Sequence, residues 1–110
     1  MARKLGALQA LADPTRRQIF ERLRKSEATV NEIAREMPVT RPAVSQHLKV
    51  LKGAGLVRER REGQYRVYGV ELRGLVELRR YLDELWLDVI SAYQDAARAK
   101  KTSERSSDDD

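Results

Sequence analysis

Apolar residues recur every three or four positions through the first third of the chain, and this spacing predicts three consecutive helices. The second helix should begin with the cap Asp13 and with Pro14 in its first turn, and should end near Lys25. The third is expected over 30–37, because Thr29 starts a capping-box pattern. The first, shorter helix carries apolar residues at Leu5, Leu8, Leu11 and Ala12. In the other two, the expected core residues are Ile19, Phe20, Leu23, Val30, Ile33, Ala34 and Met37.

The segment 39–57 has the pattern of a fourth helix with two different faces. Thr40 supplies a cap, Pro42 fits the first turn, and Gly55 can end the helix in the left-handed conformation. At about 100° per residue, one side collects Val44, Leu48 and Leu51. The opposite side collects Pro42, Ser45, Gln46 and Lys49. The apolar side should pack on a core, which leaves the polar side either simply in water or free to meet base edges in a DNA major groove.

A β-hairpin and a long helix complete the predicted fold. Residues 56–70 favour two strands joined by a turn at Glu62-Gly63, since glycine accepts a positive φ. The strand-favouring residues are Val57, Tyr65, Val67, Tyr68 and Val70. One helix is then expected from Leu72 to about Ala99. The predicted fold is mainly α, a winged helix-turn-helix of four helices, a two-stranded wing and a fifth helix.

The long helix carries an apolar stripe that a small winged domain cannot cover alone. The stripe either packs on the first helix, pairs with a second subunit, or does both; we favour both, which gives a two-fold dimer. The expected dimer contacts are Leu5, Leu8, Leu75, Leu78, Leu82, Leu85, Trp86, Val89, Ile90 and Tyr93. Residues 1–99 would form the DNA-binding and dimerisation domain. Residues 100–110 are polar without periodicity, and we expect a disordered tail.

The excess positive charge is confined to the fourth helix and the hairpin. The chain has a net charge of +5, and the segment 41–66 alone accounts for it, while the remaining residues hold equal numbers of cations and anions. The cations of this segment are Arg41, Lys49, Lys52, Arg58, Arg60, Arg61 and Arg66, against Glu59 and Glu62. This distribution is typical of a phosphate-binding surface. The alternative for the hairpin arginines is that they are solvated edge charges.

Several functional classes find no support in the sequence. The absence of cysteine excludes disulfides, thiolate metal sites and cysteine nucleophiles. No glycine-rich phosphate loop, Ser-His-Asp set or metal cluster is visible, so we expect neither an enzyme nor a bound cofactor. No apolar run is long enough to span a membrane, and Asp13-Pro14 stops the only apolar stretch near the N-terminus. We therefore expect a cytoplasmic protein without membrane contact.

Three segments together resemble the ArsR/SmtB family of bacterial winged-helix transcriptional regulators. They are Ala10-Leu11-Ala12-Asp13-Pro14-Thr15-Arg16-Arg17, Pro42-Ala43-Val44-Ser45-Gln46-His47-Leu48-Lys49 and Leu51-Lys52-Gly53-Ala54-Gly55-Leu56-Val57, and the resemblance covers about residues 5–99. It implies a homodimeric repressor, joined through its first and last helices, that binds an inverted repeat near a promoter, often its own. Metal-sensing members carry a Cys-x-Cys pattern where this chain has 28–32, or histidines on the last helix, and both are lacking here. We therefore expect no metal sensing and an effector of unknown kind.

By this resemblance and by charge, we assign candidate DNA contacts to three places. Arg16 and Arg17 would clamp phosphates, although ordinary surface charge is an equal alternative. His47, the single histidine, is more consistent with a packed helix residue than with a DNA contact. The full set is Arg16, Arg17, Thr40, Arg41, Pro42, Ser45, Gln46, His47, Lys49, Arg58, Arg60, Arg61 and Arg66. A winged-helix module that binds an acidic protein remains the alternative function, disfavoured because the polar face lacks aromatic anchors.

Overall fold

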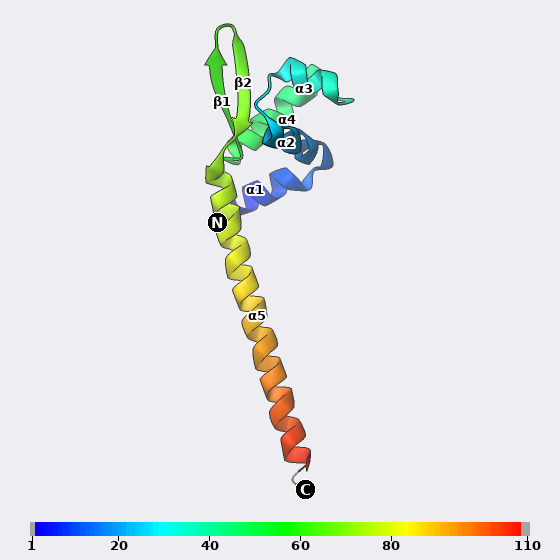
Figure 1. Cartoon of the computed structure of the whole chain (residues 1–110), viewed down its shortest axis with the longest axis vertical. Helices are drawn as coiled ribbons and strands as arrows, with labels where there is room; N and C mark the ends of the chain where they lie inside the picture. The colour runs from blue at the N-terminus through cyan, green and yellow to red at the C-terminus, as the bar shows by residue number, and fades with distance from the viewer. Residues whose placement is uncertain (1, 109–110) are drawn as a thin grey trace. The chain divides into compact units, whose positions relative to one another are not determined.

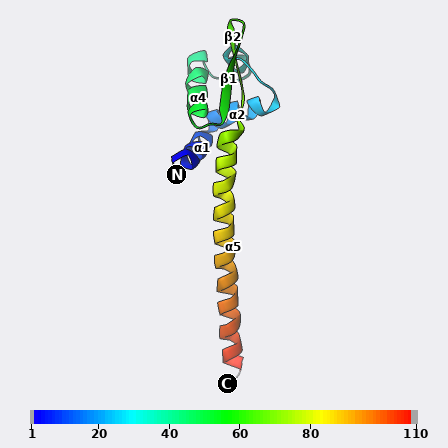
Figure 2. The ribbon, with the colours of Figure 1, turned by 90° about the vertical axis from the view of Figure 1, so that its left-hand side faces the viewer.

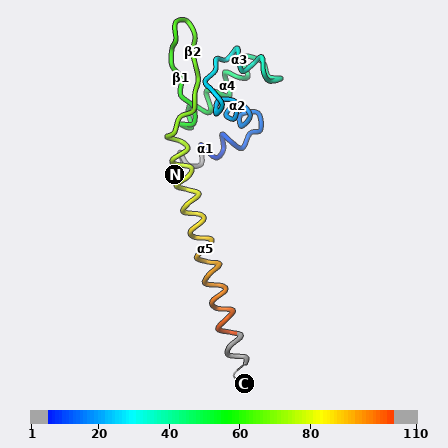
Figure 3. Tube along the Cα trace, in the orientation of Figure 1, coloured from blue at the N-terminus to red at the C-terminus, as the bar shows by residue number. Residues whose placement is uncertain are grey.

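The computed structural model has the predicted winged helix-turn-helix architecture (Figure 1). It describes residues 2–108, with the side chains of residues 6–103 (Figure 3). The element bounds are α1 Ala2–Ala12, α2 Pro14–Lys25, α3 Val30–Glu36, α4 Arg41–Gly53, β1 Val57–Glu62, β2 Tyr65–Val70 and α5 Leu72–Asp108. The chain forms two compact units, residues 1–78 and residues 79–110. The first contains the winged domain and the start of α5, and the second contains the rest of α5.

The ends of α2, α3 and α4 follow the local signals in the sequence. Asp13 and Thr40 each accept a hydrogen bond from a backbone N–H of the first turn, at 3.0 and 3.3 Å. Thr29 and Glu32 form the complete capping box. Gly55 has φ +73, and the N–H groups of Gly55 and the next residue return to carbonyls of the last turn of α4. These four predictions are confirmed.

The core of the first unit is mainly aliphatic, with Phe20 and Tyr68 as its buried aromatic residues, and α4 lies beside the hairpin (Figure 2). The expected core residues of α2 and α4 are buried, as is Ile33, and Val30, Ala34 and Met37 pack partly buried against them. Among the described side chains of α1, the buried ones are Ala7 and Ala10, which the periodicity did not single out. Leu8 is 43% exposed, and the side chain of Leu5 lies outside the described side chains, so their place in a dimer stays a prediction.

The hairpin is a six-pair antiparallel ladder with a two-residue turn. Glu62 pairs with Tyr65, so the turn is Gly63-Gln64; the predicted turn at Glu62-Gly63 was one residue too early. Gly63 has φ +62, which explains why glycine stands there. An isolated β-bridge joins the α2–α3 connection to the wing, because Ala28 and Tyr68 exchange backbone hydrogen bonds of 3.0 and 2.8 Å. No sequence pattern indicated this β-bridge.

Helix α5 differs along its length. Leu75 and Leu78 pack partly buried against the core of the first unit, so both have an intrachain contact as well as a predicted dimer contact. In the second unit, six large apolar side chains are exposed: Leu82, Leu85, Trp86, Leu87, Val89 and Tyr93. Ile90 is half-buried. The helix continues to Asp108, beyond the expected end near Ala99, because no glycine or proline follows Gly74 to stop it. None of the described helices is apolar enough over a sufficient length to cross a membrane.

Candidate nucleic-acid interface

Helix α4 separates its side chains as the sequence predicted. Val44, Leu48 and Leu51 are buried, whereas five residues of the opposite side and the first turn are exposed: Arg41, Pro42, Ser45, Gln46 and Lys49. Thr40, the cap, is also exposed. The apolar residues fix the helix to the domain, so the polar residues are presented on a rigid support. Such a rigid helix can enter a major groove and offer hydrogen-bond donors to base edges.

His47 lies at the edge of this polar face and is packed against α2. Its side chain is half-buried, and its Nδ1 atom lies 3.9 Å from Oδ2 of Asp13. The same Asp13 carboxylate caps α2, so His47 contacts the helix cap of a neighbouring element. These contacts support the packed reading of His47 over a DNA contact.

Arg16 and Arg17 have a structural role that the sequence analysis did not foresee. Arg16 Nε donates to the Ala10 carbonyl at 2.9 Å, and Arg17 Nη1 donates to the Leu11 carbonyl at 3.1 Å. Helix α1 has no basic residue in its own last turn and leaves carbonyls there without helical partners. The two arginines of the next helix satisfy these carbonyls. Phosphate clamping by either residue stays a prediction.

Carboxylates partly neutralise the cations of the wing. Arg60 pairs with Glu27 at 3.0 Å and with Glu62 at 2.9 Å, and Arg58 lies 3.9 Å from Glu27. Glu27 comes from the α2–α3 connection, outside the basic segment. The hydrogen bond from Arg60 is the main reason that the pKa of Glu27 is lowered. The free positive charge of the wing is therefore smaller than its arginine content indicates.

A second carboxylate joins α4 to the hairpin. Glu59 accepts a hydrogen bond of 2.6 Å from Lys52, and it lies 3.8 Å from Arg66. The hydrogen bond from Lys52 lowers the pKa of Glu59 first, and the hydrogen bond from the Tyr68 hydroxyl lowers it further. Among the described residues, Arg41, Lys49 and Arg61 have no such ion pair within 4 Å. These three cations are thus the most available for an anionic ligand.

We expect Glu59→Gln to reduce the acid sensitivity of folding. A glutamate with a lowered folded-state pKa stabilises the fold fully above its unfolded pKa of about 4.3, and this contribution is lost as pH falls through the folded-state pKa. Between about pH 6 and about pH 3, the free energy of unfolding in urea should therefore fall more in the wild type than in the variant. Tyr68→Phe removes one of the hydrogen-bond donors to Glu59. For this variant, the free energy of unfolding should fall with pH by an intermediate amount. Parallel pH profiles for the three proteins would contradict this account.

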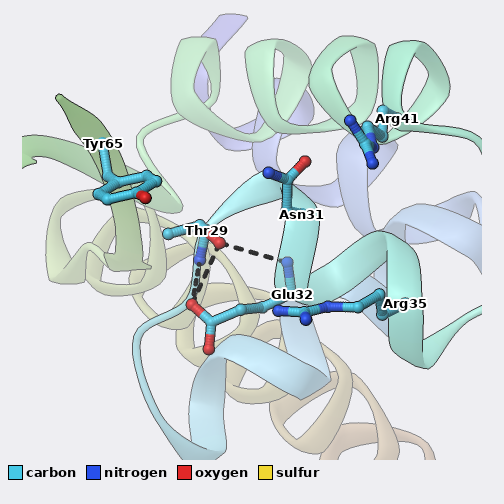
Figure 4. A pocket seen from close by; sticks show the side chains of 6 residues that line it. All are labelled: Thr29, Asn31, Glu32, Arg35, Arg41 and Tyr65. Carbon is cyan, nitrogen blue, oxygen red and sulfur yellow. Dashed lines mark hydrogen bonds between the residues drawn. The ribbon is translucent and has the colours of Figure 1, made fainter.

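A cleft opens between α3, the start of α4 and the tip of the hairpin (Figure 4). It measures about 450 Å³ and is lined by Thr29, Asn31, Glu32, Arg35, Arg41 and Tyr65. The sequence analysis placed Arg41 at the interface and missed Asn31, Arg35 and Tyr65, because α3 and the start of β2 meet α4 only in the folded chain. The described residues contain no group of three or more histidine, aspartate and glutamate side chains arranged to hold a metal ion.

Known proteins resemble this chain in sequence and in fold. Residues 11–60 match a family of helix-turn-helix domains. The HTH-type transcriptional regulator Rv2034 of Mycobacterium tuberculosis is 54% identical over 87 residues, which are 79% of this chain and 81% of that protein. The transcriptional repressor SdpR of Bacillus subtilis is 36% identical over 65 residues, which are 59% of this chain and 72% of SdpR.

Among solved structures, the homodimeric winged helix-turn-helix DNA-binding domain of Mb0332 from Mycobacterium bovis, a possible ArsR-family transcriptional regulator, aligns with a TM-score of 0.62. The identity is 26%, and the alignment covers 84% of this chain and 82% of that one. The fold and the exposed polar face of α4 define a winged helix-turn-helix DNA-binding protein. Its relatives Rv2034 and SdpR are a transcriptional regulator and a transcriptional repressor. The chain belongs to the ArsR/SmtB family of transcriptional regulators.

Proposed function

We propose that this protein is a homodimeric repressor that binds an inverted repeat near promoters, its own promoter among them. The observation that carries the proposal is the exposed polar face of α4 on a fully buried apolar base, next to a cationic hairpin. The names of two relatives support it, since SdpR is a repressor and the Mb0332 domain is a homodimer. Repression would follow from occupancy of the promoter, which excludes polymerase.

In this proposal, α4 reads the major groove and the hairpin holds the neighbouring backbone. Arg41 and Gln46 are suited to guanine and adenine respectively, and Ser45 is small enough to allow close approach. The other proposed contacts surround these three or lie on the wing: Thr40, Pro42, Lys49, Arg58, Arg61 and Arg66. Arg60, with two carboxylate partners at or below 3.0 Å, is better suited to bracing the wing than to contacting DNA.

The proposed dimer forms through α1 and α5. Its support is the apolar surface that α5 exposes between Leu82 and Tyr93, where Trp86 is 65% exposed and Tyr93 is 73% exposed. Large exposed apolar surfaces of this kind mark protein interaction sites. A two-fold pair would place two α4 helices in successive major grooves, about 34 Å apart. We also infer that the protein does not sense metals through the sites used by its family, since it has no cysteine and no histidine on α5.

The proposal is tested by comparing Arg41→Ala with the wild type on a preferred genomic fragment and on a random duplex of equal length. For the wild type, affinity should fall steeply with added salt, because bound phosphates release counterions. For Arg41→Ala, we expect a loss of about 1–3 kcal/mol on the preferred fragment and little loss on the random duplex. Fluorescence anisotropy across a salt series measures both effects.

The affinities for the two duplexes distinguish a base contact of Arg41 from a phosphate contact. Equal losses on both duplexes would assign Arg41 to a phosphate and leave DNA binding intact. A wild type that binds without salt dependence, or that prefers no genomic fragment, would refute sequence-specific DNA binding.

A further inference from the structure

The cleft between α3, α4 and the hairpin lies close to the exposed polar face of α4. A neighbouring hollow of about 250 Å³ shares Thr29, Asn31 and Tyr65 with the cleft and extends to Ser45 and Arg66. Tyr65 follows the hairpin turn directly and is 55% exposed. The two hollows therefore adjoin, and the second lies beside a residue proposed to read bases and reaches the wing.

The chemistry of the cleft is that of a site for an anion. Its only lining carboxylate, Glu32, already accepts hydrogen bonds from the Thr29 N–H at 3.0 Å and the Thr29 hydroxyl at 3.1 Å (Figure 4). These bonds lower the pKa of Glu32, so it stays ionised as part of the helix cap. The other polar side chains can all donate: the Asn31 amide N–H, the Arg35 and Arg41 guanidinium groups, and the Tyr65 hydroxyl. Guanidinium groups are well suited to phosphate oxygens.

The position of the cleft identifies which anion would reach it. If α4 occupies a major groove and the hairpin contacts the adjacent minor groove, the strand that separates the two grooves must pass between them. The cleft lies at this place, because its walls come from α3, α4 and β2. Figure 4 shows Asn31 between Tyr65 on the hairpin and Arg41 on α4.

We propose that Asn31, Arg35 and Tyr65 bind a backbone phosphate of the DNA strand that passes between α4 and the wing. This inference rests on the proposed function. It adds three DNA contacts that belong neither to α4 nor to the arginines of the wing. Arg35 supplies the charge, and Asn31 and Tyr65 supply neutral donors. The contact positions the reading face of α4 and carries no base preference of its own.

The test measures the affinity of the full chain for the preferred fragment and for a random duplex across a salt series. Arg35→Gln should weaken both by the same factor, about threefold to tenfold, because an exposed charge-assisted contact is lost. The slope of log affinity against log salt should become shallower by about 0.9, the value for one phosphate. Tyr65→Phe should weaken both by a smaller factor and leave the slope unchanged. Arg98→Gln, an exposed arginine of α5, is the matched control and should change neither.

Each other outcome overturns the inference. Unchanged affinity of Arg35→Gln on both duplexes, beside a wild type that binds, would remove Arg35 from the interface while the proposed function stands. A loss confined to the preferred fragment would make Arg35 a base-reading residue. Competition by inorganic phosphate beyond that of chloride at equal ionic strength, abolished by Arg35→Gln, would assign the cleft to a free anion. A wild type that binds neither duplex would refute the proposed function itself.

Discussion

The double substitution Leu85→Glu and Val89→Glu should convert the protein into monomers and lower its affinity for the preferred fragment by at least about 100-fold. Both side chains are exposed on one side of α5, one helical turn apart. In a wild-type dimer, burial of each of these two side chains would stabilise the association by about 1.5–3 kcal/mol. A buried, unpaired glutamate at either position would oppose association further. DNA affinity falls when the dimer is lost, because two linked α4 helices bind far more tightly than one. Sedimentation equilibrium and anisotropy measure the two effects.

Ser91→Glu is the control for this substitution. Ser91 is exposed on the opposite side of the same helix, so the added charge should leave both dimer and affinity unchanged. If the double variant sediments as a dimer, or if the wild type is already a monomer at the concentrations that bind DNA, the proposed dimer interface on α5 is wrong.

Gly74→Ala should lower the free energy of unfolding by about 3 kcal/mol, because the site has no room for a methyl group. A Cβ at Gly74 would lie 2.5 Å from the Ala54 carbonyl oxygen and 2.7 Å from the Gly55 carbonyl oxygen. Both oxygens belong to backbone and cannot move as a flexible side chain does. The Gly74 N–H also donates to the Gly55 carbonyl at 2.7 Å, so a shift breaks a hydrogen bond between the start of α5 and the residues that follow α4. Urea unfolding at one fixed chain concentration gives the value.

Gly53→Ala provides the matched comparison. A Cβ at Gly53 meets no atom within 4 Å, and the residue is the last of helix α4. Alanine favours helix over glycine by up to about 1 kcal/mol, so the substitution should be neutral or stabilising. Equal destabilisation by the two substitutions would show that the close approach at Gly74 is not the cause.

Local features of the fold were predictable because they depend on neighbours in the sequence. Asp13, Thr29 and Thr40 are caps whose partners lie three residues away. Gly55 ends α4 through the backbone freedom of one residue. The buried and exposed faces of α4 follow from helical spacing alone.

Features that join distant segments could not be predicted in this way. Glu27 reaches Arg60 across 33 positions, and Ala28 pairs with Tyr68, only after α2 and the hairpin are folded together. The described core face of α1 includes Ala7 and Ala10, which have little hydrophobic signal but leave room for a neighbouring helix to approach closely. The end of α5 was also missed, because a run of charged residues is compatible with both a helix and a loop.

In the candidate DNA interface too, local features were predictable and features that join distant segments were not. Counting cations identified the basic segment, but it could not tell that Arg60 is held by two carboxylates while Arg61 is paired with none among the described residues. Nor could it assemble the cleft, since Asn31 and Arg35 of α3 are separated in the sequence from Tyr65 of β2 by α4 and β1. The residues most useful for further mutagenesis are therefore those that only the structure brings together.

The most direct test of the central claim is a hydroxyl-radical footprint of the full chain on its preferred genomic fragment. A two-fold pair of reading helices predicts two protected patches related by symmetry, with centres about one turn of B-form DNA, or about 10 base pairs, apart. The sequences beneath them should form an inverted repeat. A single protected patch, or uniform weak protection along the fragment, would contradict a dimer that reads successive major grooves through α4.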